Sequence, residues 1–211
     1  MKTKNLRKLF EYDYVKDKLF VKVYPKNGNE YLLIQAPHKE IEDLVLFPYV
    51  LLDKSSTGEI VSAVVSNDML KAYGLDENVL IDLALFNSME LFPAVVEDIN
   101  SVIASLMGIP LSETETSSQI VVTNTENAFG ASTLFYPEVM EELARRHNGN
   151  YFILPSSIQE VITMPDNGDF TYEELKEMVT EINHAQVAPK DRLTDEVYYY
   201  DATKREFRKG R

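Results

Sequence analysis

Residues 129–166 constrain the fold of this chain more than any other stretch, because they combine strand, helix, strand and turn signals. An apolar run follows Gly130, and Pro137 then stands where the first residue of a helix would be, a position that suits its fixed φ. Buried strands are predicted at 151–154 and 161–164. This alternation of elements indicates an α/β protein.

Paired strand signals indicate the kind of sheet. Two apolar strands surround a loop within 41–65, and a strand, a turn and the apolar run follow one another within 119–136. Both segments predict hairpins, and hairpins join antiparallel strands. We therefore predict an α/β fold of the α+β type, in which four or five helices pack on a mixed, largely antiparallel sheet. Pro48 cannot donate to a strand ladder, so it predicts an edge position, a bulge or a break.

Helix caps are the clearest local signals. Thr171 and Glu174 have the spacing of a capping box at the start of a helix. Ser157 and Glu160 have the same spacing, and Asn67 and Asp76 are predicted N-caps.

The polar, low-complexity stretch 111–118 predicts a linker between two lobes. The N-terminal lobe, 1–110, would contain a strand, a hairpin and helices. The C-terminal lobe, 119–203, would contain a hairpin, helix, strand, helix and strand, followed by a basic tail at 204–211.

Charge is unevenly distributed along the chain. Residues 1–26 contain eight Lys/Arg and three acidic residues, and residues 204–211 contain five Lys/Arg and one acidic residue. The body between them, residues 27–203, contains 8 basic and 30 acidic residues, a net charge of −22. This acidic body repels nucleic-acid phosphates, so we expect no binding to nucleic acid. Three interpretations stay open: simple solubility, a basic protein partner, or mimicry of a nucleic-acid backbone.

Several classes of protein are disfavoured by what the sequence lacks. There is no cysteine, hence no disulfide or thiolate chemistry. The longest apolar run, 44–52, is short of the roughly 20 residues that span a membrane, and the N-terminal segment has no apolar core of a secretory signal. We expect a bacterial cytoplasmic protein that does not enter a membrane.

A small number of residues are candidates for chemistry. His38 lies among acidic residues, where a histidine could act as a general base or a metal ligand, or could simply hold a bend. Ser156 and Glu160 could form a nucleophilic site, although no nucleophile motif surrounds them and helix capping explains the nearby Ser157. Because His38, His147 and His184 are isolated and the glycines are scattered, we predict no metal site and no cofactor.

Four segments carry a resemblance to a known family: PH at 37–38 followed by EDLV at 42–45, GASTLFYP at 130–137, ILPSSIQEV at 153–161, and QVAP with LTDEVYYYD within 186–201. From Tyr14 to Asp201 the chain resembles a family of hypothetical proteins with a domain of unknown function, common in gut-dwelling Clostridia and related Firmicutes. The resemblance implies a shared fold, without an activity, cofactor or catalytic residue. Members often carry a further N-terminal region ahead of the position of Leu6, so we expect a short member or a fragment.

Three functions remain as hypotheses. The leading one is a non-enzymatic interaction or accessory module with an unidentified protein partner. The second is an enzyme with a site near His38 and the 154–160 turn, in which Ser156 and Glu160 take part. The third is an acidic nucleic-acid mimic that binds a cationic protein.

Overall fold

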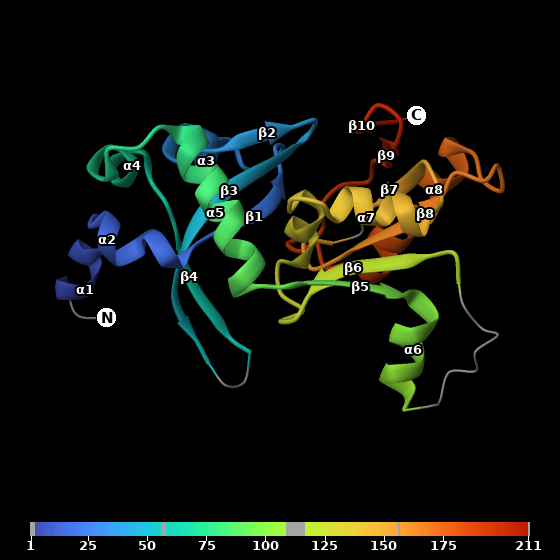
Figure 1. Cartoon of the computed structure of the whole chain (residues 1–211), viewed down its shortest axis with the longest axis horizontal. Coiled ribbons are helices and arrows are strands. Elements are labelled where there is room, and N and C mark those ends of the chain that lie inside the picture. Colours follow the sequence, from blue (N-terminus) through green and yellow to red (C-terminus); the bar gives the residue numbers. More distant parts are fainter. Residues whose placement is uncertain (1–2, 56–57, 109–116, 156, 211) are drawn as a thin grey trace. The chain divides into compact units, whose positions relative to one another are not determined.

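The computed structural model describes residues 3–55, 58–108, 117–155 and 157–210 (Figure 1). The chain forms two compact units, which divide between Pro93 and Ala94. Most of the predicted linker, residues 111–116, lies outside the described part of the chain, so the predicted lobe boundary there stays a prediction.

The first unit is built on an antiparallel sheet. β3 is central: β1 runs along one of its sides, and β2 and β4 share the other. β3 and β4 form a hairpin, which confirms the prediction for 41–65. The strands are β1 (Leu19–Pro25), β2 (Lys39–Ile41), β3 (Leu44–Lys54) and β4 (Ile60–Val64).

Pro48 lies inside β3 without breaking it. β2 pairs with residues 44–46 and β4 with residues 49–54, so Pro48 occupies the point where β3 changes neighbour. Its carbonyl accepts a hydrogen bond from the N–H of Val65, and no strand requires the N–H that proline lacks. Of the three predicted alternatives, a break and a bulge at Pro48 are wrong, because β3 is continuous there and its register irregularity lies further on, between Leu51 and Asp53. An edge position is wrong for β3 as a whole, because β3 is the central strand of its sheet.

Helix α5 packs against β1 and β3 and closes the larger apolar core of the first unit. Asp76 caps α5 as predicted. The prediction for α4 is wrong by one residue, because Ser66, not Asn67, accepts the N–H of Met69. The helices of this unit are α1 (Thr3–Lys8), α2 (Tyr12–Val15), α3 (Glu30–Gln35), α4 (Asn67–Tyr73) and α5 (Glu77–Leu91), with a 3-10 turn η1 at Lys16–Lys18.

The second unit contains its own sheet, in the order β10-β9-β7-β8-β6-β5, and every neighbouring pair is antiparallel. The predicted basic tail is wrong for its middle part, because residues 206–209 pair with β9 as the last strand. The strands are β5 (Ala94–Asp98), β6 (Ile120–Asn124), β7 (Tyr151–Leu154), β8 (Val161–Pro165), β9 (Tyr198–Asp201) and β10 (Glu206–Lys209).

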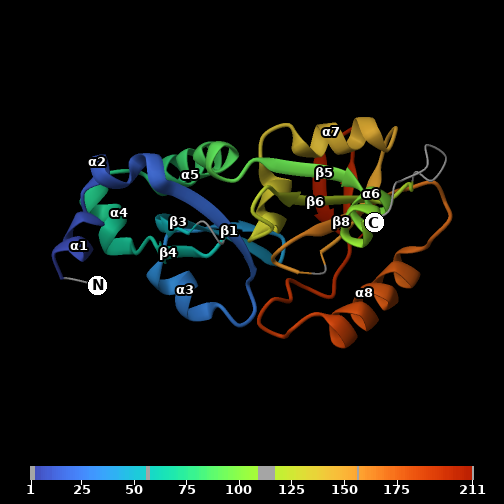
Figure 2. The same ribbon diagram turned by 90° about the horizontal axis from the view of Figure 1, so that it is seen from below.

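Helices cover both faces of this second sheet. Within the unit, Figure 2 shows α7 and α8 on opposite sides of the strands. α8 buries Leu175 and Val179 against Phe152, Met164 and Tyr199. The helical segments are α6 (Ile99–Met107), a 3-10 helix η2 (Gly130–Phe135), α7 (Val139–Arg146) and α8 (Tyr172–Gln186).

The second predicted hairpin, 119–136, is wrong. Both sides of β6 are already paired, with β5 and β8, so no edge is free for another strand. The chain instead forms η2, which packs against β6. Gly130 makes this possible, because a Cβ there would overlap the Thr123 hydroxyl and the Gln159 carbonyl oxygen.

The α+β class is thus confirmed, with two antiparallel sheets in place of the single mixed sheet that the sequence predicted, and with about six substantial helices in the described parts of the chain. Among these helices, none is long and apolar enough to cross a membrane.

The capping box at Thr171 is present as predicted. The Thr171 hydroxyl accepts the N–H of Glu174 at 3.3 Å, and the Glu174 carboxylate accepts the N–H of Thr171 at 2.8 Å. Thr171→Ala should lower the free energy of unfolding by about 1 kcal/mol, measured by urea denaturation. Thr180→Ala, in the middle of the same helix, should change it little; equal effects of the two substitutions would contradict the assignment.

Gly130→Ala should destabilise the fold by about 1–3 kcal/mol, since the new methyl group meets backbone as well as side-chain atoms. Ala131→Gly is the neighbouring control in η2, where no new contact is created. Thermal unfolding followed by circular dichroism gives both values, and a Gly130→Ala midpoint at or above that of the wild type would refute the close packing of η2 on β6.

Candidate functional site

His38 is held by its own backbone surroundings in the first unit. Its Nδ1 lies 3.0 Å from the Ala36 carbonyl oxygen, and its backbone N–H donates to the Glu77 carboxylate at 2.7 Å. Nε2 is 3.9 Å from Glu40 Oε1, and the ring packs beside Phe47. These contacts join the segment after α3 to the start of α5, as expected for a histidine that holds a bend.

The other predicted site residues belong to the second unit. Glu160 is exposed, and Ser156 lies outside the described residues. A common site of His38, Ser156 and Glu160 therefore stays a prediction.

The predicted cap at Ser157 and Glu160 is wrong, because residues 157–160 form a bridge and a bend in place of a helical turn. The Ser157 hydroxyl accepts the N–H of Gln159. The backbone of Ile158 is engaged on both sides: its N–H donates to Asp191 O, and its carbonyl accepts from Ala131. Helical hydrogen bonds are thereby excluded, and the Glu160 side chain is left at the surface.

The two remaining histidines make separate local contacts. His147 Nε2 lies 2.8 Å from the Thr163 hydroxyl, and burial lowers the pKa of His147 to about 4, so it is neutral at pH 7. His184 Nε2 is 3.6 Å from Asp195 Oδ2. Among the described residues, no three side chains of His, Asp or Glu come together in a way that could hold a metal ion.

Lys22 is a site that the sequence reasoning missed. It is only 5% exposed, its Nζ donates to the Ser62 hydroxyl at 2.9 Å, and it lies 4.3 Å from the centre of the Tyr49 ring. The alternation of residues 18–24 predicts a strand with one buried face, which leaves Lys22 in water beside Phe20. The structure instead buries both faces of β1. A lysine between aromatic residues on a strand was the available signal.

Burial sets the electrostatics around Lys22. It lowers the pKa of the Lys22 ammonium to about 8, and it raises the pKa of the neighbouring Tyr49 phenol far above its usual value. An amine with such a pKa is a competent base or nucleophile. The amino group is nevertheless covered, so the geometry favours a structural role.

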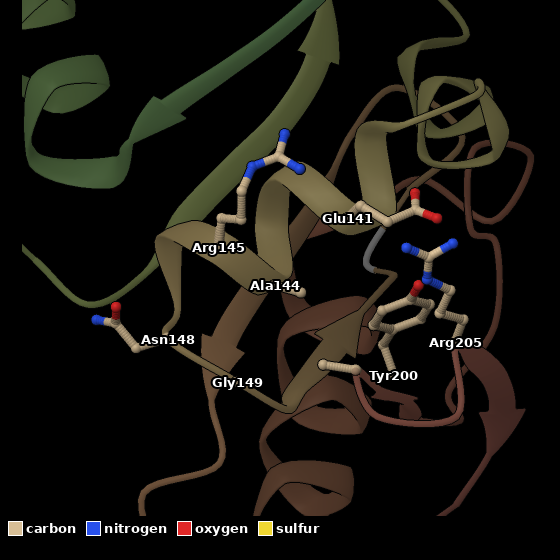
Figure 3. A pocket seen from close by; sticks show the side chains of 8 residues that line it. Glu141, Ala144, Arg145, Asn148, Gly149, Tyr200 and Arg205 are labelled. Atoms are coloured by element: carbon tan, nitrogen blue, oxygen red, sulfur yellow. The ribbon is translucent and has the colours of Figure 1, made fainter.

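A polar hollow of about 540 Å³ lies between α7 and the turn that joins β9 to β10. Figure 3 shows the Arg205 guanidinium between the Glu141 carboxylate and the Tyr200 ring, whereas Arg145 and Asn148 point away from this group. Burial and Glu141 raise the pKa of Tyr200, and Arg205 opposes that rise. The charges of Glu141 and Arg205 offset each other, and Arg145, which also lines the hollow, leaves its lining with a single net positive charge.

A model of a family of unknown function, DUF5688, matches residues 1–202. The chain belongs to the DUF5688 family. This confirms the resemblance to a family without known activity, and the match covers all of the first unit and the second unit as far as Ala202. No curated protein and no solved structure matches the chain.

One surface of this DUF5688 protein with exposed apolar side chains is on α5. Leu80, Ile81 and Ala84 face the core, yet large apolar side chains also face the solvent: Val79 is 54% exposed and Phe86 63%. Helical spacing places these two residues on one side, together with Met89, at 39% exposure. We call Val79, Phe86 and Met89 the α5 stripe.

The acidity around the α5 stripe follows from the sequence. Asp82 and Glu90 are exposed and, by their spacing, lie on the same side of the helix as the stripe. α5 contains no lysine or arginine. The α5 stripe therefore combines exposed apolar side chains with negative charges on the same side of the helix.

The burial of Lys22 generates a prediction for the pH dependence of stability. Below pH 8 the amine is protonated in both states, and its burial destabilises the fold by a constant amount. Between pH 8 and 10.5 the unfolded chain keeps a proton that the folded protein has lost, so this group makes the free energy of unfolding rise with pH. Methionine at this position cannot titrate. The free energy of unfolding of Lys22→Met, minus that of the wild type, should therefore fall by roughly 2–3 kcal/mol from pH 7 to pH 10.

Urea denaturation at several pH values measures this difference. Lys71→Met is the matched control, because the Lys71 side chain is 78% exposed and its substitution should leave the pH dependence unchanged. A difference between Lys22→Met and the wild type that does not vary with pH would contradict the lowered pKa.

Proposed function

We propose that this DUF5688 protein is a non-enzymatic interaction module of the bacterial cytosol, and that the α5 stripe binds a helix of a partner protein. The observation that carries the proposal is the exposure of Val79, Phe86 and Met89 on a helix whose opposite side is already buried. The cytosolic setting rests on the sequence expectations alone.

The pattern of the α5 stripe supports a helical partner. A helix that is apolar on every side is normally buried on every side. The intervals from Val79 to Phe86 and from Phe86 to Met89 are seven and three residues, the spacing by which one helix packs along another. Exposed apolar side chains gathered on one side of a surface helix are a feature of association sites in soluble proteins, and Asp82, between Val79 and Phe86 on that side, adds a negative charge among them.

Charge supports a basic partner over a second copy of the chain. Asp82 and Glu90 would meet the same acidic residues, or come close to them, across a symmetric α5–α5 contact, and like charges disfavour such a contact. A partner helix with lysine or arginine beside its apolar face would pair with them. The enzyme and the nucleic-acid mimic stay predictions without a specific observation in their favour.

The test uses the full chain and a synthetic amphipathic helical peptide with leucines along one face and lysines elsewhere. We expect fluorescence anisotropy to show binding that weakens at least tenfold in Phe86→Glu. This substitution adds negative charge, so it would strengthen a purely electrostatic contact with the peptide. Loss of binding would thus identify the apolar contribution of Phe86.

Ile34→Glu is the matched control, because Ile34 is a 71% exposed apolar residue on another helix of the same unit. It should bind the peptide like the wild type. Equal binding by Phe86→Glu and the wild type would overturn the proposal. Self-association in sedimentation velocity that Phe86→Glu abolishes would also overturn it, in favour of a dimer.

A further inference from the structure

Two hollows adjoin on the α8 side of the second sheet. One, of about 370 Å³, lies beside α6, and the other, of about 390 Å³, lies beside α8. The lining includes Glu97, Leu106 and Val121 in the first hollow, Ile162 and Ile182 in the second, and Glu160 in both.

The strand register shows that the hollows are neighbours. Val121 of β6 lines the first, Ile162 of β8 lines the second, and these two residues are direct partners across the β6–β8 pair. Glu160 lines both. Together they form one groove with two wells, which we call the α6–α8 groove.

The lining of the α6–α8 groove has a consistent chemistry. Most of its residues are aliphatic, and among the described residues that line it the only charged ones are Glu97 and Glu160. Neither carboxylate has a hydrogen-bond or ion-pair partner in the part of the chain that the structure describes. Each well is within the range of about 300–1,000 Å³ that is common for ligand sites, which combine an apolar lining with a few polar groups.

The apolar surface continues beyond the wells along α6. Leu106, which lines the first well, is 83% exposed, and Ile103 and Met107 on the same helix are also exposed. A ligand confined to the wells would leave these side chains in water. A longer ligand would cover them, which favours a segment of polypeptide over a small molecule.

We propose that the α6–α8 groove binds a short basic peptide segment of a partner protein, which places one apolar side chain in each well and a lysine or arginine against Glu160. Pairing of an ammonium or guanidinium group with this carboxylate selects basic over acidic segments. The site is separate from the α5 stripe and belongs to the other unit, so either surface can fail its test alone.

The test is fluorescence anisotropy with the full chain and a labelled, end-blocked octapeptide that alternates leucine and lysine. We expect saturable binding by the wild type. The same peptide with serine for leucine, or with glutamate for lysine, should bind at least tenfold more weakly. No detectable binding of the leucine–lysine peptide at millimolar concentration overturns the proposal.

Substitutions locate the binding site. Glu160→Lys and Ile182→Ser should each weaken binding at least tenfold. Glu160→Lys reverses the charge that lines both wells, and Ile182→Ser removes an apolar side chain that lines the second well. Glu173→Lys is the charge control: this exposed residue of α8 does not line the groove, and its variant should stay within twofold of the wild type.

Two further results separate this site from general acidity and from the α5 stripe. Equal weakening by Glu160→Lys and Glu173→Lys would show attraction to net charge and overturn the proposal. Phe86→Glu should leave binding of the octapeptide unchanged, and a loss in that variant would place the peptide on α5 and also overturn it.

Discussion

The close approach of η2 to β6 is the constraint on which the second unit depends. Gly130 allows this approach, and the 157–160 turn is then fixed from several sides: the Thr123 hydroxyl and the Phe129 N–H both donate to Gln159, and Ala131 donates to the carbonyl of Ile158. This set of hydrogen bonds replaces the helix cap that the sequence suggested. It also places Glu160 on the outer side of the turn, between the two wells of the α6–α8 groove.

A buried serine has a comparable role in the first unit. The Ser88 hydroxyl accepts the N–H of Val21 at 3.0 Å and donates to the carbonyl of Ala84 at 2.7 Å. β1 lies at the edge of its sheet, so this N–H has no strand to bind, and α5 satisfies it. The same contact fixes the rotation of α5 about its axis. Because α5 has apolar residues on both sides, its apolar pattern alone does not determine which side faces water. The hydrogen bonds of the Ser88 hydroxyl determine it.

Local signals in the sequence predicted local structure well. The Thr171 capping box, the Asp76 cap and the β3–β4 hairpin each depend on residues that are close in sequence, and all three are present. Features that depend on distant neighbours were missed: η2 follows from the occupied edges of β6, and the burial of Lys22 follows from a second covered face of β1. Of the predicted site residues, Glu160 does line a groove, although nothing in its local pattern showed which strands and helices would surround it.

The edges of the second sheet determine how this unit can meet another protein. At β5, the Arg146 guanidinium donates to the outward carbonyl of Val96 at 2.7 Å, and at the other end β10 covers β9, with Phe207 stacked on Tyr198. Three of the four residues of β10, Glu206, Arg208 and Lys209, are charged, which discourages further pairing. Both edges are thus protected against the addition of a foreign strand. The sheet cannot readily grow into a polymer, and any association of this unit would use its side-chain surfaces, where selectivity depends on shape and charge and a complex can dissociate.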